Sequence, residues 1–117
     1  NVGVGFASGQ STTSGIANVS VGTQALNSNT TASNNTAVGY QSLYDNTTGV
    51  RNSAYGDNSL ANNTTANNNN AFGYLSLYTN TTGTANVAMG TEALVSPPHP
   101  TTQQLGIRLG ILILLGQ

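Results

Sequence analysis

The sequence has no cysteine or tryptophan, and it is poor in proline and aromatic residues. Only 3 prolines occur among its 117 residues, and aromatic residues make up 6% of the chain. Without cysteine there is no disulfide framework and no thiolate metal site. A polar composition with few aromatics is also typical of disordered chains. Only an ordered pattern along the sequence argues for a folded protein.

Charge is scarce as well. Charged residues make up 4% of the chain, and the formal net charge is −1. A globular domain is typically about one-quarter charged, so the surface must be built from neutral Asn, Thr, Ser and Gly. Proteins bind nucleic acid through clustered Lys and Arg that displace counterions, whereas Arg51 and Arg108 are isolated. We therefore expect no nucleic-acid partner.

What the sequence does contain is a repeat of 17 residues, whose positions we number from 1 to 17. Asparagine opens each unit, at Asn1, Asn18, Asn35, Asn52, Asn69 and Asn86. Glycine occupies position 5, at Gly5, Gly22, Gly39, Gly56, Gly73 and Gly90. Position 9 holds Gly9 and then Leu26, Leu43, Leu60, Leu77 and Leu94. Columns that keep one register cannot be low-complexity noise, and such repeats decide the fold.

The short unit favours strands over helices. Seventeen residues hold two short strands and two turns, but not the paired helices of α-solenoids, whose periods start near about 33 residues. Asn and Gly at fixed offsets mark turns. We predict that residues 1–95 are all-β, a repeat β-solenoid or parallel β-roll of about six coils stacked ~4.8 Å apart. One unit has too small a core to fold alone, and Asn1 lies inside the pattern, so we expect a slice of a longer fibre.

Five segments share the form apolar-Gly-x-x-(Ala/Ser): 21–25, 38–42, 55–59, 72–76 and 89–93. With the preceding Asn-Ser-Ala or Asn-Thr-Ala, they resemble the head repeats of trimeric autotransporter adhesins. The whole unit, with its Gly-Tyr-Gln-Ser-Leu and Asn-Thr-Thr-Gly blocks, resembles repeats of phage tail-fibre proteins. The resemblance covers residues 1–95, although this unit is longer than that of the adhesin heads. It implies a homotrimer or filament at the cell surface or on the virion, a structural or adhesive spacer that touches a glycan or protein receptor.

Tyrosine pairs return every 34 residues, in units three and five. A rigid amphipathic ring gives a large contact area, so the candidate ligand-binding residues are Tyr40, Tyr44, Tyr74 and Tyr78. The alternative is that these rings fill space at the coil surface or between chains. We expect the alternation to keep the rings from stacking on one another.

The triplet Asn-Thr-Thr predicts stacked ladders, formed by Asn29, Asn46, Asn63 and Asn80 and by Thr30, Thr47, Thr64 and Thr81. These asparagines also begin Asn-x-Thr glycosylation acceptors, but a spacing of about 4.8 Å leaves no room for a glycan on each. A second hypothesis is a single-chain solenoid whose Thr columns order water or ice, with one Thr per coil pointing outward. A third is a purely structural extracellular filament.

No set of residues suggests catalysis. Catalysis needs a nucleophile with its base, paired carboxylates or a metal cluster, whereas Asp45, Asp57 and Glu92 fall in different columns of the repeat. We expect no enzymatic activity, no cofactor and no metal site.

The repeat stops at Ser96, and residues 96–117 are predicted to be an irregular tail. Its apolar stretch is too short for a membrane span and contains Arg108. Regrouping the possible codons from the third base permits Thr-Thr-Ala-Ser-Asn-Asn-Thr-Thr-Ile-Gly-Tyr-Gln-Ala, nearly a copy of residues 30–42. We hypothesise that the tail is an out-of-frame reading of a seventh repeat.

Overall fold

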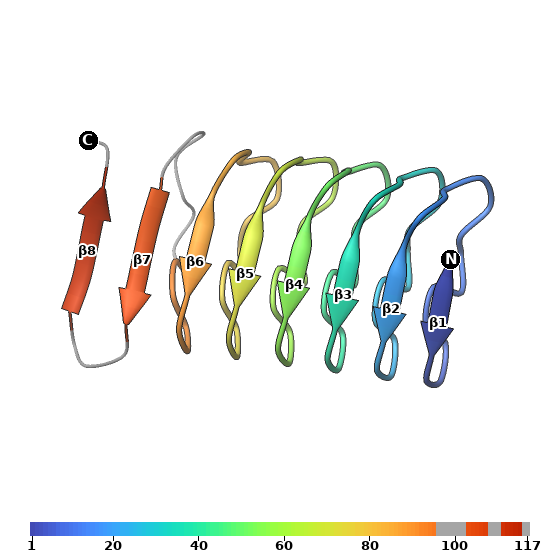
Figure 1. The fold of residues 1–117 in the computed structure, drawn as a ribbon, viewed down its shortest axis with the longest axis horizontal. Helices are drawn as coiled ribbons and strands as arrows, with labels where there is room; N and C mark the ends of the chain where they lie inside the picture. Colours follow the sequence, from blue (N-terminus) through green and yellow to red (C-terminus); the bar gives the residue numbers. More distant parts are fainter. Residues whose placement is uncertain (96–102, 108–110, 116–117) are drawn as a thin grey trace.

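The computed structural model describes residues 1–95, 103–107 and 111–115, with six short parallel strands in the repeat region. The strands are β1 (Val2–Val4), β2 (Val19–Val21), β3 (Thr36–Val38), β4 (Ser53–Tyr55), β5 (Asn70–Phe72) and β6 (Val87–Met89). They lie side by side in chain order, one from each coil (Figure 1). Each strand from β1 to β5 pairs with the residues 17 further along in the next. The predicted all-β solenoid is confirmed, and the described residues contain no helix.

The glycines at position 5 form a row along the sheet, one after each strand. Their φ angles lie between +121° and +130°, a region that L side chains rarely adopt. A Cβ atom on Gly22, Gly39, Gly56 or Gly73 would lie 2.6–2.8 Å from backbone atoms of the next glycine. Position 5 therefore requires glycine both for its dihedral angle and for the close approach of the next coil.

Three further positions turn each coil through left-handed backbone. Positions 7, 9 and 17 have φ between 50° and 62°. Position 9 is the leucine column, although leucine in this conformation costs roughly 1–2 kcal/mol. Complete burial of the side chain, as for Leu43 and Leu60 at 0% exposure, returns about 1.5–3 kcal/mol. Gly9 occupies the same conformation without that cost.

The interior of each coil has an apolar half and an amide half. The leucines of position 9 pack with small residues of position 3, such as Ala54 and Ala71, in one hydrophobic cluster. Buried asparagines from positions 1 and 12 fill the other half. Because this apolar core is narrow, much of the stability of the fold must come from hydrogen bonds between coils.

Those hydrogen bonds continue beyond the three-residue strands. The main-chain N–H of Leu26 donates to Ser42 O at 2.9 Å, and that of Thr47 donates to Thr64 O at 2.9 Å. Equivalent bonds recur in neighbouring coils. Backbone groups at the corners are therefore paired along the axis, as buried backbone requires.

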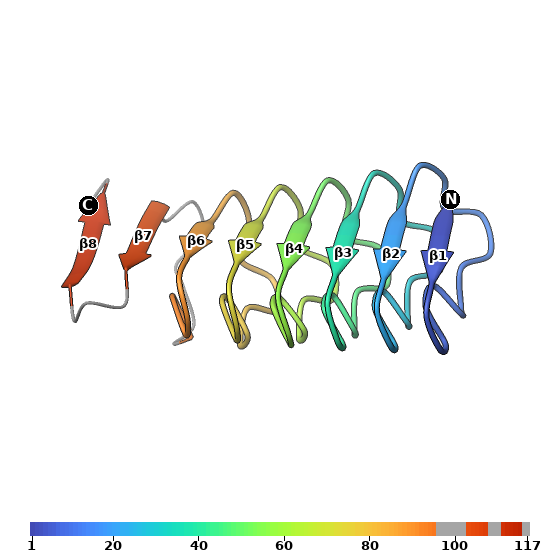
Figure 2. The same ribbon diagram turned by 60° about the horizontal axis from the view of Figure 1, so that its bottom comes forward.

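The tail continues the sheet but not the repeat register. β7 (Gln103–Ile107) pairs with β6 at a single position, Val87 with Gln103. These two residues are 16 apart in sequence, whereas partners in the earlier strands are 17 apart. β8 (Ile111–Leu115) then pairs antiparallel with β7 (Figure 2). These two strands stand where the sequence predicted an irregular tail. The out-of-frame hypothesis stays a prediction, and residues 96–102 lie outside the described part.

Candidate functional surface

The asparagines of position 12 stack as one buried amide ladder. The Nδ2 groups of Asn46, Asn63 and Asn80 each donate to Oδ1 of the preceding coil, at 3.1, 2.9 and 3.0 Å. Each Nδ2, including that of Asn29, also donates to the main-chain carbonyl at position 15 of its own coil, at 2.9–3.1 Å. All four side chains are at most 1% exposed. Their role is internal, since the amides bind one another and the backbone.

A second amide column uses the asparagines that open each unit. Their Oδ1 atoms accept the main-chain N–H of the next coil's asparagine at 2.9–3.0 Å. The Nδ2 groups of the first five donate to the position 15 carbonyl of their own coil, so that Asn52 and Asn63 both bind Ala66 O. The sequence analysis used these asparagines only as repeat markers. Their presence in all six units was the signal for a structural role.

Two acceptors of these ladders, one in the fifth coil and one in the sixth, stay open at the C-terminal end of the described repeats. Asn80 Oδ1 and Asn86 Oδ1 are buried and accept no hydrogen bond from any described residue. In earlier coils the equivalent oxygens, such as Asn63 Oδ1 and Asn69 Oδ1, accept from the coil that follows. A further coil stacked in the same register would supply both donors.

The burial of position 12 also bears on glycosylation. The acceptor asparagines Asn29, Asn46, Asn63 and Asn80 are enclosed and hydrogen-bonded in the folded protein. Asn34, which also begins an Asn-x-Thr acceptor, is exposed. A glycan on the ladder asparagines would therefore have to displace the core.

The threonines of position 13 form a hydroxyl row. The hydroxyl of Thr30 donates to Thr47 O at 3.2 Å, and Thr47 and Thr64 repeat this contact with the next coil, Thr64 with Thr81 O. These hydroxyls therefore donate their hydrogen bonds to main-chain carbonyls of the next coil. All four threonines of position 14 are exposed to solvent: Thr31, Thr48, Thr65 and Thr82. The water-ordering hypothesis covered these threonines or their neighbours, and a row at position 14 would be the one open to solvent.

One face of the solenoid is uncharged and carries a column of apolar side chains. We call it the outer sheet face, formed by the side chains of positions 2 and 4 on β1 to β6. Position 4 is apolar in every coil, and Val4 and Met89 are 57% and 47% exposed. The rings of Tyr55 and Phe72 stack there, with centroids 4.9 Å apart and planes within 5°. Extended apolar surfaces of this kind usually mark an interaction site.

The four predicted tyrosines fall into two columns rather than one site. Tyr40 and Tyr74 occupy position 6 and are each 47% exposed, whereas Tyr44 and Tyr78 occupy position 10 and are half-buried. Phe6, 77% exposed, extends the first column. We call Phe6, Tyr40 and Tyr74 the ring column. The sequence analysis missed Phe6 because the first unit has no tyrosine to signal it.

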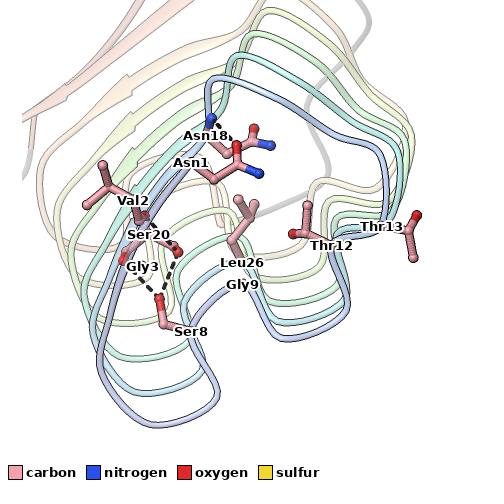
Figure 3. Close-up of a pocket in the computed structure, with 10 residues that line it drawn as sticks. All are labelled: Asn1, Val2, Gly3, Ser8, Gly9, Thr12, Thr13, Asn18, Ser20 and Leu26. Carbon is pink, nitrogen blue, oxygen red and sulfur yellow. Dashed lines mark hydrogen bonds between the residues drawn. The ribbon is translucent and has the colours of Figure 1, made fainter.

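A pocket of about 260 Å³ opens beside the first coil. Figure 3 shows Leu26 projecting into it from the second coil, with the hydroxyls of Ser8 and Ser20 on one side. The pocket exists because Gly9 carries no side chain where later coils carry leucine. Its hydroxyls are engaged with each other, since Ser8 Oγ donates to Ser20 Oγ at 2.7 Å and to Ser20 O at 2.8 Å.

Filling this pocket should stabilise the protein. The variant Gly9→Leu/Ser20→Ala reproduces the pairing of Leu26 with Ala37 one coil later. The alanine is included because Ser20 Oγ would lie 3.2 Å from the new Cβ. Burial of leucine, reduced by its left-handed strain, should raise the free energy of unfolding by about 1 kcal/mol. Urea denaturation measures it, and an unchanged or lower stability would contradict this account of the pocket.

Ionisable groups do not gather into a reactive site. Within residues 1–95, no three His, Cys, Asp or Glu side chains come close enough to hold a metal ion. The described residues also contain no helix long and apolar enough to cross a bilayer. The candidate functional surfaces are the outer sheet face and the ring column.

The geometry defines a β-solenoid with few charged residues, an amide-rich core and one uncharged face that carries a column of exposed apolar side chains. Comparison with protein-family models, curated proteins and solved structures gives no match.

Proposed function

We propose that this chain is a structural or adhesive segment of an extracellular fibre, a phage tail fibre or a cell-surface adhesin. Copies associate side by side through the outer sheet face, as a homotrimer in the arrangement that the repeat resemblance implies. The segment acts as a spacer and presents its remaining surface to a cell-surface glycan or protein receptor.

The observation that carries the proposal is the composition of the outer sheet face. It contains no charged residue over six coils, and Val4, Tyr55, Phe72 and Met89 are all at least 36% exposed. Burial of such surface between chains contributes roughly 25 cal/mol per Å². The narrow internal core makes this contribution important, because a coil cannot bury enough apolar area by itself.

Light scattering after size-exclusion chromatography tests the proposal. We expect a mass three times the 11.9 kDa of one chain. The variant Tyr55→Thr/Phe72→Thr should shift the mass to that of one chain and keep the circular dichroism spectrum, because threonine already occurs on this face at Thr36. The control Ile16→Thr removes an exposed apolar residue at position 16, where Thr84 stands in a later coil, and should leave the mass unchanged. A wild-type protein that remains a single chain at every concentration would refute the association.

A further inference from the structure

We propose that the ring column, formed by Phe6, Tyr40 and Tyr74, binds an extended, neutral β-1,4-linked glycan that runs along the solenoid axis. This binding site rests on the receptor role proposed above and deepens it by naming the class of ligand. The ring column lies at position 6, outside positions 2 and 4 of the outer sheet face, so association and glycan binding can fail independently.

The spacing of the coils does not by itself require the alternation of rings at position 6. Rings occur in coils one, three and five, with Thr23 and Asp57 between them and Thr91 in the coil that follows. If adjacent coils could not hold stacked rings, the gaps would be required. Yet Tyr55 and Phe72 stack in adjacent coils at 4.9 Å. The coils can therefore hold rings in adjacent positions, and the expectation that the alternation keeps the rings apart stays a prediction beside the one argued next.

A second alternation, at position 15, does have a steric cause. Glycine and alanine alternate there, and a Cβ on Gly15 or Gly49 would lie 2.1 or 2.3 Å from the carbonyl oxygen of Ala32 or Ala66. Position 5 shows no such difference between odd and even coils, since its close approaches stay at 2.6–2.8 Å throughout. The backbone just before the ring column is thus uniform, and the ring spacing is a property of the side chains alone.

The ring spacing selects the kind of ligand. Two coils advance by roughly 9.6 Å, at about 4.8 Å each. An extended peptide presents the same face every two residues, about 6.6–6.8 Å, and so falls out of step with the rings. In an extended β-1,4-linked glycan each pyranose is turned over relative to the last and advances by about one coil. The same sugar face therefore returns at every second coil, where it can lie flat on a ring.

The groups between the rings suit a neutral sugar chain. Asp57 lies in the gap between Tyr40 and Tyr74, and its carboxylate accepts a hydrogen bond from the Asn58 amide. Gln41 Nε2 donates to Gln24 Oε1 at 2.8 Å at the adjacent position 7. Amides and a carboxylate beside aromatic rings are typical of sites that orient a polar ligand. Asp57 would repel an anionic polymer, so a neutral glycan is favoured.

The test measures binding of cellohexaose and β-1,4-mannohexaose by isothermal titration calorimetry, with α-linked maltohexaose for comparison. Wild-type protein should bind at least one β-1,4-linked hexaose more tightly than maltohexaose. Tyr74→Thr should weaken that binding about tenfold, the value of one aromatic stacking contact of about 1.4 kcal/mol. Threonine is the matched replacement because Thr23 and Thr91 already occupy position 6.

A swap variant tests the spacing itself. Tyr74→Thr/Thr91→Tyr keeps the composition but separates this ring from Tyr40 by three coils. It should bind as weakly as Tyr74→Thr alone. The proposal is overturned if neither β-1,4-linked hexaose binds, if maltohexaose binds equally well, or if the swap binds like wild type. It is also overturned if Tyr74→Thr changes the mass of the assembly and not glycan binding, because the ring column would then contact a second copy of the chain.

Discussion

Replacing Gly39 with alanine is expected to lower the free energy of unfolding by about 2 to 6 kcal/mol. The new Cβ would lie 2.7 Å from the carbonyl carbon and oxygen of Gly56, and the backbone has φ +129°. Strained backbone costs about 1–3 kcal/mol, and overpacking against a rigid neighbour adds about 1–3 kcal/mol. Small domains are stable by only about 5–15 kcal/mol, so the melting temperature should fall steeply.

Gly9→Ala is the matched control for this prediction. Gly9 also has a positive φ, of 60°, but the equivalent position carries leucine in later coils. The nearest atom to its added Cβ is the side-chain oxygen Ser20 Oγ at 3.2 Å. We expect a change within about 1 kcal/mol. Equal stability of the Gly39→Ala and Gly9→Ala variants in urea denaturation would contradict the close stacking of position 5.

Asn63→Ala should cost about 3 to 5 kcal/mol of stability. Asn63 Nδ2 donates to Asn46 Oδ1 and to Ala66 O, and its Oδ1 accepts from Asn80 Nδ2. Each lost hydrogen bond contributes about 0.5–1.5 kcal/mol, and each buried partner left unpaired costs about 1–3 kcal/mol. The loss should appear as a lower denaturation midpoint with an unchanged m-value.

The adjacent Asn62 provides the control. It is half-buried rather than enclosed, so Asn62→Ala should change stability by no more than about 0.5 kcal/mol. If the two variants are equally stable, the amide ladder contributes nothing and the core must be explained by the leucine column alone.

The repeat allowed the fold class to be predicted because every coil repeats the same contacts. Like residues at a spacing of 17 had to stack, and the glycine and Asn-Thr-Thr columns located the turns and ladders. The left-handed conformation of the leucines was missed, since leucine rarely adopts it. Gly9 in that column was the only clue, because glycine is the residue most often found at positive φ.

The candidate surface was less predictable than the fold. Which side of a coil faces outward depends on its corners, and the spacing alone did not separate Tyr40 and Tyr74 from Tyr44 and Tyr78. Position 13 was expected in the stacked ladder, but the use of its hydroxyls by the neighbouring backbone depends on coil geometry. The enzyme, localisation and receptor expectations stay predictions.

Disulfide formation tests the stacking of like residues most directly, because the chain has no native cysteine to compete. Thr48→Cys/Thr65→Cys places two cysteines in adjacent coils with their Cα atoms about 4.8 Å apart. A disulfide requires Cα atoms about 4.4–6.8 Å apart, so this pair can form one. Ser53→Cys/Thr65→Cys brings the pair closer in sequence but across the coil. Ser53 is at position 2 and Thr65 is at position 14, next to position 13, and Val2 and Thr13 lie on opposite sides of the coil in Figure 3. The solenoid predicts rapid oxidation of the first pair and little of the second under native conditions. Faster oxidation of the Ser53/Thr65 pair would contradict it.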